Sequence, residues 1–486
     1  MKDSQIKFPQ KGANKDRVLS KMEAARQHDV KWRQGKVFSL VYAVDQEVSQ
    51  LLKDAYLMFF SENGLNPTAF PSLRKFETEV VSMAASLLGG DANVVGNMTS
   101  GGTESLLMAV KTARDWARSQ RPDASQPEMI LPASAHPAFD KASHYFGVKA
   151  VRVPVREDLR ADVDACRAAI NANTILMVGS APSFPHGVVD PISDLAQIAH
   201  NQGLLFHVDA CVGGFMLPFV RRLGYSVPDF DFQVPGVTSM SADLHKYGYA
   251  AKPASLILYR DPELRRYQFF VTTDWSGGVY PSPTMTGTRP GGSIAAAWAV
   301  INFLGEDGYL RITKMVMNAV LKIRQGIASI PGIEVLGDPE MSIMAIASKK
   351  LDIYQIGDEL TLHGWHLDRQ QFPPSVHLTV NYANAQMADD FLIALDNAVA
   401  KARRPSLHKA STGLMLRLAN AAVRVLPAET VSRLMGRASS MLGIQGSTLP
   451  GRSAAIYGMI GTLPNRHDLH DLVTDLIDSM TRLGDA

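Results

Sequence analysis

The chain of 486 residues has only two cysteines, Cys166 and Cys211, and no long apolar run that is free of ionisable groups. Two cysteines are too few for a disulfide framework, and such usage is typical of a reducing compartment. The most apolar stretch, residues 204–220, carries His207 and Asp209 in its middle, where ionisable groups would be costly in lipid. We therefore expect a soluble, cytoplasmic protein without a transmembrane helix.

A surplus of charge of one sign is also lacking. The chain has 49 basic and 47 acidic residues and a net charge of +2, so its composition gives no reason to expect nucleic-acid binding. Residues 1–21 lack the apolar core of a signal peptide. With 46% hydrophobic and 20% charged residues, the chain can bury a sizeable core.

Short apolar runs alternate with helix-like segments in the middle of the chain. Six runs are typical of strands: 129–135, 149–155, 174–181, 204–210, 237–243 and 255–260. Helical spacing of apolar residues lies between several of them, as in 162–172 and 191–202. This alternation predicts an α/β fold with a largely parallel sheet that helices cover on both faces.

The pattern changes after residue 310. Long helical stretches follow, with a few strand candidates such as 342–348 and 375–381. We expect three parts. They are an N-terminal segment over residues 1–60, a large α/β domain over 61–310 and a smaller C-terminal α+β domain over 311–486.

Residues 99–105, TSGGTES, form a glycine turn in front of a long amphipathic helix. Glycines permit close backbone approach, and the helix that begins near Thr103 directs free N–H groups at an anion. The hydroxyls of Ser100 and Ser105 add donors. A phosphate site and a simple capped helix start explain this turn equally well, because short Gly/Ser/Thr motifs often match by accident.

The stretch HVDACVGGF, residues 207–215, places a carboxylate at the end of a buried strand. Alternate side chains of a strand share a face, so His207, Asp209 and Cys211 point the same way. The buried Asp209 needs a partner. A protonated ring nitrogen of a cofactor is one candidate, and an internal arginine or backbone donors are the other; taken alone, Asp209 favours the latter.

Two lysines, Lys246 and Lys252, lie in DLHKYGYAAK, residues 243–252. A lysine becomes a nucleophile when desolvation or a neighbouring charge lowers its pKa, and Lys246 has His245 and aromatic residues beside it. The alternative, favoured when the stretch is taken alone, is a side chain that passes aromatic surface to reach water. His136, just after the first predicted strand, can stack on a flat ring or be an ordinary surface histidine.

Together these four stretches describe one apparatus. A phosphate-binding turn, a ring-stacking histidine, a carboxylate for a pyridinium nitrogen and a lysine for a Schiff base are what pyridoxal 5'-phosphate requires. They fall at the ends of successive strands, where open α/β sheets place their ligands. The combination predicts a pyridoxal 5'-phosphate enzyme, and no metal site is expected.

Longer strings of the sequence resemble a known family. HVDACVGGF, TSMSADLHKYGYAAKPAS, YQFFVTTDWSGGVYPSPTMTGTRPGG and AAIYGM are similar to the sphingosine-1-phosphate lyases of the pyridoxal-phosphate-dependent group II decarboxylase family. The similarity extends from about residue 32 to near the C-terminus. The resemblance implies the fold of fold-type I pyridoxal-phosphate enzymes, which is like that of aspartate aminotransferase. Membrane-bound members carry an N-terminal anchor that this chain lacks, so we expect the soluble bacterial type.

The resemblance also implies how the cofactor is held. Lys246 would bond to it, Asp209 would pair with the pyridinium nitrogen, and His136 would stack on the ring. The other residues expected at the cofactor are Gly101, Gly102, Thr103, His207, Ser241, His245 and Gly292. The last of these belongs to RPGG, residues 289–292, which is similar to a loop that reaches the cofactor phosphate of the neighbouring subunit. The resemblance therefore also implies an obligate homodimer whose two subunits share their active sites.

The implied activity is carbon–carbon cleavage of a phosphorylated long-chain base, a phospholipid-like substrate, to a fatty aldehyde and phosphoethanolamine. Residues that match positions around the substrate are Tyr42, Asn66, His186, Lys252 and Tyr457. Candidate acids and bases for the reaction are Lys246, His186 and Tyr457. An amino-acid decarboxylase with the same fold and cofactor is the alternative, and a catalytically silent lipid- or protein-binding scaffold is a weaker one.

The chain departs from the family at residues 63–71, NGLNPTAFP. Asn66 stands where the family has a histidine near the substrate phosphate, and an amide donates a hydrogen bond without carrying a charge. Lys252 and Tyr42 remain to hold a phosphate. The departure leaves the cofactor chemistry untouched and leaves the identity of the substrate open.

Residues 413–442 mix apolar positions with Arg417, Arg424 and Arg433. Such a stretch can pack against the main domain or a dimer partner, which is the favoured interpretation because most amphipathic helices face a core. Peripheral contact with a membrane is the alternative.

Overall fold

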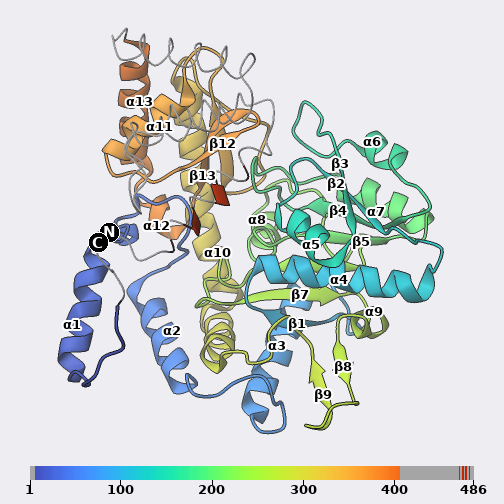
Figure 1. Ribbon diagram of the computed structural model, residues 1–486. Coiled ribbons are helices and arrows are strands. Elements are labelled where there is room, and N and C mark those ends of the chain that lie inside the picture. The colour runs from blue at the N-terminus through green and yellow to red at the C-terminus, as the bar shows by residue number, and fades with distance from the viewer. Residues whose placement is uncertain (1–5, 405–469, 471–472, 475–476, 479–480, 482–486) are drawn as a thin grey trace, which may run out of the picture.

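A seven-stranded sheet forms the centre of the computed structural model, which describes residues 6–404, 470, 473–474, 477–478 and 481 (Figure 1). The strand order is β1-β7-β6-β5-β4-β2-β3. The strands are β1 (Val95–Thr99), β2 (Glu128–Pro132), β3 (Lys149–Val153), β4 (Thr174–Ser180), β5 (Leu205–Asp209), β6 (Ser239–Ala242) and β7 (Ser255–Tyr259). Strands β2 to β6 are parallel, whereas β7 is antiparallel to β6 and β1. This mixed, mostly parallel sheet confirms the predicted fold class.

The strands show where the sequence was informative. Each of the six predicted strands overlaps one of β2 to β7. The sequence did not reveal β1, because Gly96 and Asn97 are poor strand formers. A Cβ on Gly96 would lie 2.3 Å from the carbonyl oxygen of Ile257, so the close pairing with β7 requires glycine there.

Helices cover both faces of this sheet (Figure 1). They are α3 (Pro71–Leu87), α4 (Gly102–Gln120), α5 (Ala138–Phe146), α6 (Val163–Ala168), α7 (Ile192–Asn201), α8 (Leu217–Arg222) and α9 (Pro262–Arg266). Along β7 the side chains alternate between two buried clusters. Leu256 and Leu258 belong to the cluster that includes α3, α7 and α8, and Ile257 and Tyr259 to the one that includes α4 and α5. Burial on both faces explains why these strands are apolar throughout.

A second, antiparallel sheet has the strand order β10-β11-β13-β12. Its strands are β10 (Glu334–Val335), β11 (Ile343–Ala347), β12 (Asp368–Gln371) and β13 (Pro374–Thr379), and its helices are α11 (Ile353–Leu362), α12 (Tyr382–Ala385) and α13 (Ala388–Arg403). It confirms the smaller C-terminal α+β unit. The long helix α10 (Gly291–Ser329) runs between the two sheets and bends at Gly305, whose φ of 56° lies in the left-handed region (Figure 1). The boundary predicted near residue 310 falls inside α10 and stays a prediction.

Three elements lie at the margin of the molecule. Helix α1 (Lys15–Ala25) has no buried residue and stands apart from the body, while α2 (Gln46–Met58) packs along α10 (Figure 1). Strands β8 (Phe270–Thr272) and β9 (Tyr280–Ser282) form a hairpin. Within the described residues, no helix is long and apolar enough to cross a membrane. Tyr457 and the arginine-bearing stretch 413–442 lie outside the described residues.

Candidate active site

The side chains that could take part in catalysis or cofactor binding meet at one edge of the seven-stranded sheet. The parallel strands end there and the antiparallel strand β7 begins there, so Thr99 of β1, Asp209 of β5 and Ser255 of β7 share the edge. The loop from β6 to β7 contains no helix and adds Asp243 and Lys246. Open α/β sheets bind their ligands at this edge.

Lys246 is paired with Asp243. Its Nζ lies 2.7 Å from the Asp243 carboxylate, which is 1% exposed and also accepts a hydrogen bond of 2.5 Å from Ser255 Oγ. Burial, the largest single influence, would lower the pKa of Lys246, but its neighbours, Asp243 first among them, together raise it. Burial would likewise raise the pKa of Asp243, and the charge of Lys246 lowers it instead. The sequence-based expectation of a lysine with a lowered pKa is therefore wrong.

Asp209 and its two strand neighbours meet at one hydroxyl. Ser241 Oγ lies 3.3 Å from His207 Nε2, 3.4 Å from Asp209 Oδ1 and 3.2 Å from Cys211 Sγ. His207 is fully buried, bonds to Ser239 Oγ at 2.9 Å, and has its pKa lowered to about 4 by burial. In the part of the chain that the structure describes, Asp209 has no ion-pair partner. Its internal partners are a hydroxyl and the N–H of Cys211, and the arginine alternative is absent there.

The turn before α4 has the form of an anion site. Gly101 caps the helix without a side-chain acceptor, so no cap occupies the N–H groups of the first turn, to which Thr103 belongs. A Cβ on Gly102 would lie 2.9 Å from both Asp243 Oδ2 and Cys211 Sγ, so only glycine fits. A Cβ on Gly101 would meet only His245 Cε1, at 3.6 Å, which places that ring beside the turn.

The sequence did not reveal Asp243 and Glu104 as parts of this edge. Glu104 is buried and accepts the N–H of Ser100 at 2.6 Å and that of Met285 at 2.8 Å, so it ties the turn to the segment after the β8–β9 hairpin. An acidic residue in the first turn of a helix is common and carries no special signal. For Asp243 the signal was present, since a carboxylate stands three residues before Lys246.

Two other predicted residues lie near Lys246. His136 Nδ1 accepts the N–H of Ala138 at 3.1 Å, and burial lowers the pKa of the ring, so the imidazole is neutral at neutral pH. The Tyr42 ring packs edge-on against that of Tyr247, with centroids 5.0 Å apart. Burial raises the pKa of Tyr42 to about 12, and the charge of Lys246 opposes that rise. Both side chains are therefore uncharged neighbours of the lysine.

Lys252 is the second lysine of the loop. Its side chain is exposed, and its Nζ donates to the carbonyl oxygen of Leu40, which precedes Tyr42 closely in the chain. Partial burial and the charge of Lys246 both lower the pKa of Lys252. The structure thus places Lys252 near Lys246 and in contact with the segment that carries Tyr42.

Other predicted residues have no direct interaction with Lys246 in the described chain. His186 lies on the loop after β4, is 4% exposed, and has an Nδ1 without a partner among the described residues. Burial and the neighbouring His377 lower its pKa to about 4. Gly292 packs on α2, where a Cβ would lie 2.8 Å from the ring of Tyr56.

Asn66 also lies apart, and it has a local task. Its Oδ1 accepts the N–H of Thr68 at 3.0 Å, the hydroxyl of Thr68 at 2.7 Å and the N–H of Ala69 at 3.2 Å. Two residues before it, the N–H of Gly64 donates to the carbonyl oxygen of Arg289 at 2.8 Å. The segment that carries Asn66 is therefore attached to the RPGG loop.

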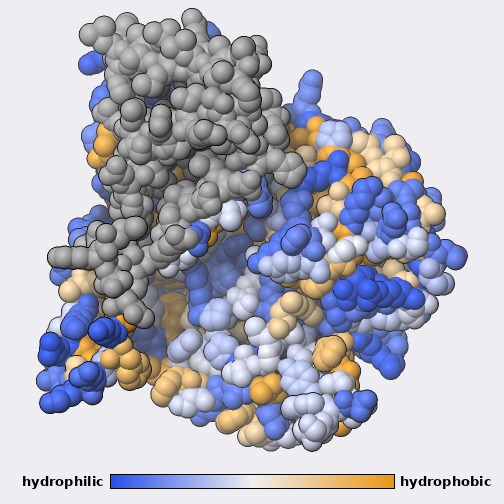
Figure 2. Space-filling model, in the orientation of Figure 1, coloured by the Kyte–Doolittle hydropathy of each residue, from blue (hydrophilic) through white to orange (hydrophobic). Residues whose placement is uncertain are grey.

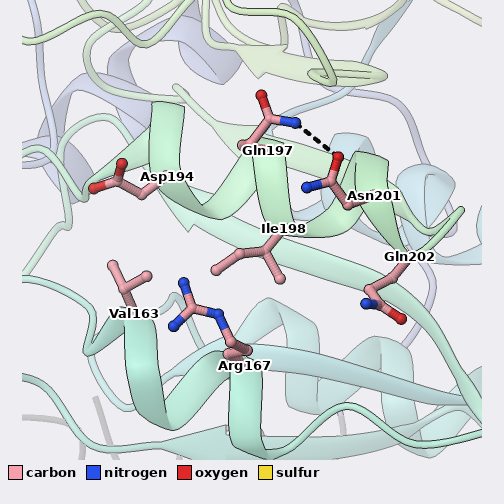
Figure 3. Close-up of a pocket in the computed structure, with 7 residues that line it drawn as sticks. All are labelled: Val163, Arg167, Asp194, Gln197, Ile198, Asn201 and Gln202. Carbon is pink, nitrogen blue, oxygen red and sulfur yellow. Dashed lines mark hydrogen bonds between the residues drawn. The ribbon is translucent and has the colours of Figure 1, made fainter.

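A groove between α6 and α7 is separate from this edge. It has a volume of about 390 Å³ and is lined by residues of both helices, among them Arg167 and Asp194 (Figure 3). Gln197 on its rim donates to Asn201 at 2.8 Å. None of the residues that line the groove belongs to the Lys246 cluster.

The edge fits pyridoxal 5'-phosphate on four observations. Among the residues that the structure describes, the turn at Gly101 has N–H groups without a side-chain cap and Asp209 has no cation partner. His136 is a neutral ring, and Lys246 lies among these groups. These are the groups that bind the phosphate, the pyridine nitrogen, the ring and the aldehyde carbon of that cofactor. Fold and site together define a fold-type I pyridoxal 5'-phosphate enzyme.

Comparison with known proteins gives the family. The model described as the pyridoxal-dependent decarboxylase conserved domain matches residues 1–349, and the chain belongs to this family. A sphingosine-1-phosphate lyase of Arabidopsis thaliana is 43% identical over 97% of this chain and 80% of its own. A probable L-aspartate decarboxylase of Pyrococcus furiosus is 36% identical over 74% of this chain and 94% of its own. The solved structure of a sphingosine-1-phosphate lyase from Burkholderia pseudomallei superposes with a TM-score of 0.80, at 39% identity over 85% of this chain and 96% of its own.

Proposed function

We propose that the protein is a pyridoxal 5'-phosphate-dependent carbon–carbon lyase of phosphorylated long-chain sphingoid bases, with a fatty aldehyde and phosphoethanolamine as products. The observation that carries the proposal is the position of Lys252 and Tyr42 beside Lys246. Besides the groups for the cofactor, the site has a cation and a phenol that can bind a second phosphate. Similarity to sphingosine-1-phosphate lyases over most of the chain supports the same conclusion.

The proposal assigns the cofactor to the edge of the sheet. Lys246 would bond to its aldehyde carbon, Asp209 would pair with its ring nitrogen, and His136 would cover the ring. Ser241 and the fully buried His207 act through Asp209, whose carboxylate the Ser241 hydroxyl orients. The residues assigned to its phosphate are Gly101, Gly102, Thr103 and His245.

The residues of the chain then bind the substrate and move its protons. When bound, pyridoxal 5'-phosphate supplies a sink for the electron pair of the breaking bond. A base takes the proton of the 3-hydroxyl group, whose oxygen becomes the aldehyde oxygen as the neighbouring carbon–carbon bond breaks. The carbon that bears the amine then takes up a proton. Of the candidate bases, His186 is neutral at pH 7 and has a buried Nδ1 without a hydrogen-bond partner in the described part of the chain, while Tyr457 lies outside that part.

We also propose that two copies of the chain share their active sites. Apolar side chains are exposed at the end of α2 and on the hairpin, and apolar surface gathers along the lower edge of Figure 2. The most exposed of them are Leu57, Met58, Phe60, Trp275 and Val279, with exposed fractions from 57% to 71%. Such a surface is typical of a buried interface. The RPGG loop and the attached Asn66 lie in this region, so a partner would receive them at its own Lys246.

An amino-acid decarboxylase is the second candidate, and the similarity to the Pyrococcus furiosus protein favours it. A decarboxylase needs a cation for the substrate carboxylate and releases carbon dioxide. The lyase needs a cation for a phosphate and releases an aldehyde. Lys252 can bind either a carboxylate or a phosphate. The product that is released therefore distinguishes the decarboxylase from the lyase.

Incubation of the purified protein with sphingosine 1-phosphate, followed by an assay for fatty aldehyde, tests the proposal. We expect aldehyde from the wild type and none from Lys246→Ala, which should also lose the visible absorbance of the lysine-bound cofactor. Carbon dioxide from an amino acid, with no aldehyde from the phosphorylated base, would overturn the proposal. A wild-type protein that cannot be reconstituted with the cofactor would favour a scaffold without catalysis.

A further inference from the structure

Arg152 holds the turn that carries His136, between β2 and α5. It lies on β3, the strand at one edge of the seven-stranded sheet. Its Nη1 donates to the carbonyl oxygens of Pro132, Ala133 and Ala135, at 3.1, 3.2 and 3.3 Å. These carbonyl groups belong to the chain that leads from the end of β2 to His136. A single nitrogen therefore gathers three carbonyl groups of the turn.

The other side of the same guanidinium binds helix α5. Nε of Arg152 donates to Asp140 Oδ1 at 3.1 Å and Nη2 donates to Asp140 Oδ2 at 2.7 Å, and Asp140 lies in the first turn of α5. The Asp140 side chain is 51% exposed, and an exposed ion pair alone contributes little to stability. The planar fork of arginine binds a carboxylate with two nitrogens while the third nitrogen binds carbonyl groups, which a lysine cannot do. Arg152 thereby fixes the turn relative to the start of α5.

The start of α5 in turn orients the imidazole of His136. The Nδ1 atom of His136 accepts the N–H of Ala138 at 3.1 Å, and its carbonyl oxygen accepts the N–H of Phe139 at 3.1 Å. Phe139 is fully buried, and its ring lies edge-on to that of His207 with centroids 6.1 Å apart. The orientation of the His136 ring therefore depends on how the turn is joined to α5, which is the junction that Arg152 spans.

We propose that Arg152 is a positioning residue for the cofactor, which it affects through His136 by holding the imidazole in the place from which it covers the cofactor ring. Stacking of two flat rings requires a defined distance and orientation. A histidine on a turn that has lost three carbonyl contacts and its tie to α5 would lose part of that stacking. The inference rests on the proposed role of His136.

A double-mutant cycle on cofactor affinity tests the inference without recourse to catalysis. In the wild-type background, Arg152→Gln should raise the dissociation constant of pyridoxal 5'-phosphate about tenfold, as a titration followed by visible absorbance would show. In the background of His136→Ala, which has no ring left to position, Arg152→Gln should add about a factor of two or less. Equal effects of Arg152→Gln in the two backgrounds would overturn the inference, as would a His136→Ala protein with wild-type affinity.

The visible circular dichroism of the bound cofactor gives a second readout, because it depends on how the protein holds the ring. Arg152→Gln and His136→Ala should both change it. The matched control is Arg156→Gln, since Arg156 also binds a carboxylate with two nitrogens, that of Asp158 at 3.3 and 2.6 Å, just beyond β3. This control should keep the affinity and the dichroism of the wild type, and an equal change in Arg156→Gln would contradict the inference.

Two further variants separate geometry from charge and from folding. Arg152→Lys keeps the positive charge without the fork and should behave like Arg152→Gln, so wild-type affinity in Arg152→Lys would overturn the inference. Asp140→Asn breaks the other side of the same arrangement at an exposed position, and it takes the place of Arg152→Gln in the cycle if that protein does not fold.

Visible absorbance of the wild-type protein with pyridoxal 5'-phosphate separates this inference from the proposed function. Its absence would contradict both. Its presence, together with equal effects of Arg152→Gln in the two backgrounds, would contradict only the role of Arg152.

Discussion

Asn66 shows at the level of one residue how a local structural task and a functional task can coincide. Its side-chain oxygen accepts three hydrogen bonds from Thr68 and Ala69 and so fixes the turn before α3. The amide nitrogen is the part of the group left to approach a ligand. The family likeness alone presented this residue as a missing charge, whereas the structure presents it as a rigidly held donor.

Asn66→Asp keeps the three accepted hydrogen bonds and adds a negative charge. We expect an unchanged cofactor absorbance and a Michaelis constant for the phosphorylated substrate raised about tenfold, because about 1.4 kcal/mol of repulsion corresponds to that factor. Asn66→His should change the same constant without changing the absorbance. Steady-state kinetics measure both. An unchanged Michaelis constant in Asn66→Asp would show that this segment does not approach the substrate phosphate.

The buried imidazole of His207 predicts how stability depends on pH. Its pKa is about 4 in the folded protein and near 6.5 in the unfolded chain, so between these values only the unfolded chain takes up the proton. The free energy of unfolding should therefore fall as the pH falls from 6.5, by on the order of 3 kcal/mol at pH 4. Urea unfolding of His207→Gln should show a smaller fall. Equal slopes in the two proteins would contradict the assignment.

The sequence could bring candidate residues together where chemistry demands one residue type. Lys246, Asp209, His136 and the glycine turn were assigned to the cofactor because few cofactors need that combination, and their individual roles stay predictions. The pKa of Lys246 could not be predicted from the sequence. It depends on the Asp243 carboxylate, whose burial and distance of 2.7 Å from Lys246 Nζ are defined only in the folded chain. The position of Asn66 and Gly292 away from this chain's own Lys246 also depends on tertiary structure.

At the level of elements, the turn before α4 and the segment that holds the β8–β9 hairpin are parts of one unit. Glu104, in the first turn of α4, accepts one N–H from each, at Ser100 and at Met285. Lys111 on the same helix donates to the carbonyl oxygens of Tyr267 and Gln268, at 2.7 and 3.0 Å, just before the hairpin. Helix α4 therefore fixes both ends of the hairpin segment relative to the turn that precedes it.

Glu104→Gln replaces one acceptor oxygen by an NH2 group that faces a backbone N–H. One buried hydrogen bond is lost, at a cost of about 1–3 kcal/mol. We expect the dissociation constant of pyridoxal 5'-phosphate to rise about tenfold or more, as a cofactor titration followed by absorbance would show. Glu263→Gln on the exposed surface is the matched control. Equal affinities of the two variants would mean that the turn does not depend on Glu104.

The elements also show what the sequence determines. Continuous apolar runs predicted six strands, and helical spacing predicted some of the helices that cover them, such as α6 and α7. The sequence did not predict strand β1 or the antiparallel direction of β7. Strand pairing is set by tertiary contacts and not by the local sequence pattern. The loop between β6 and β7, which carries Lys246, is too irregular to serve as a helical crossover, and so β7 returns antiparallel.

For the whole molecule, shared active sites can be tested by mixing subunits. Lys246→Ala removes the proposed bond to the cofactor, and Asn66→Asp weakens the proposed contact with the substrate phosphate. In a mixed dimer, the Lys246 of the Asn66→Asp chain would receive the unchanged Asn66 of the other chain. We expect mixing after partial unfolding to restore the wild-type Michaelis constant. A constant that stays as high as in Asn66→Asp alone would show that Asn66 serves its own chain's site.

The most direct measurement for the proposed lyase is product analysis by mass spectrometry after incubation of the holoenzyme with sphingosine 1-phosphate in deuterium oxide. Acid and base side chains exchange their protons with solvent, so the carbon that loses its bond should take up deuterium. We predict one fatty aldehyde for each phosphoethanolamine, a single deuterium on the carbon that bears the amine, and no product from Lys246→Ala. Intact substrate without aldehyde from a protein that shows the cofactor absorbance would contradict the assignment.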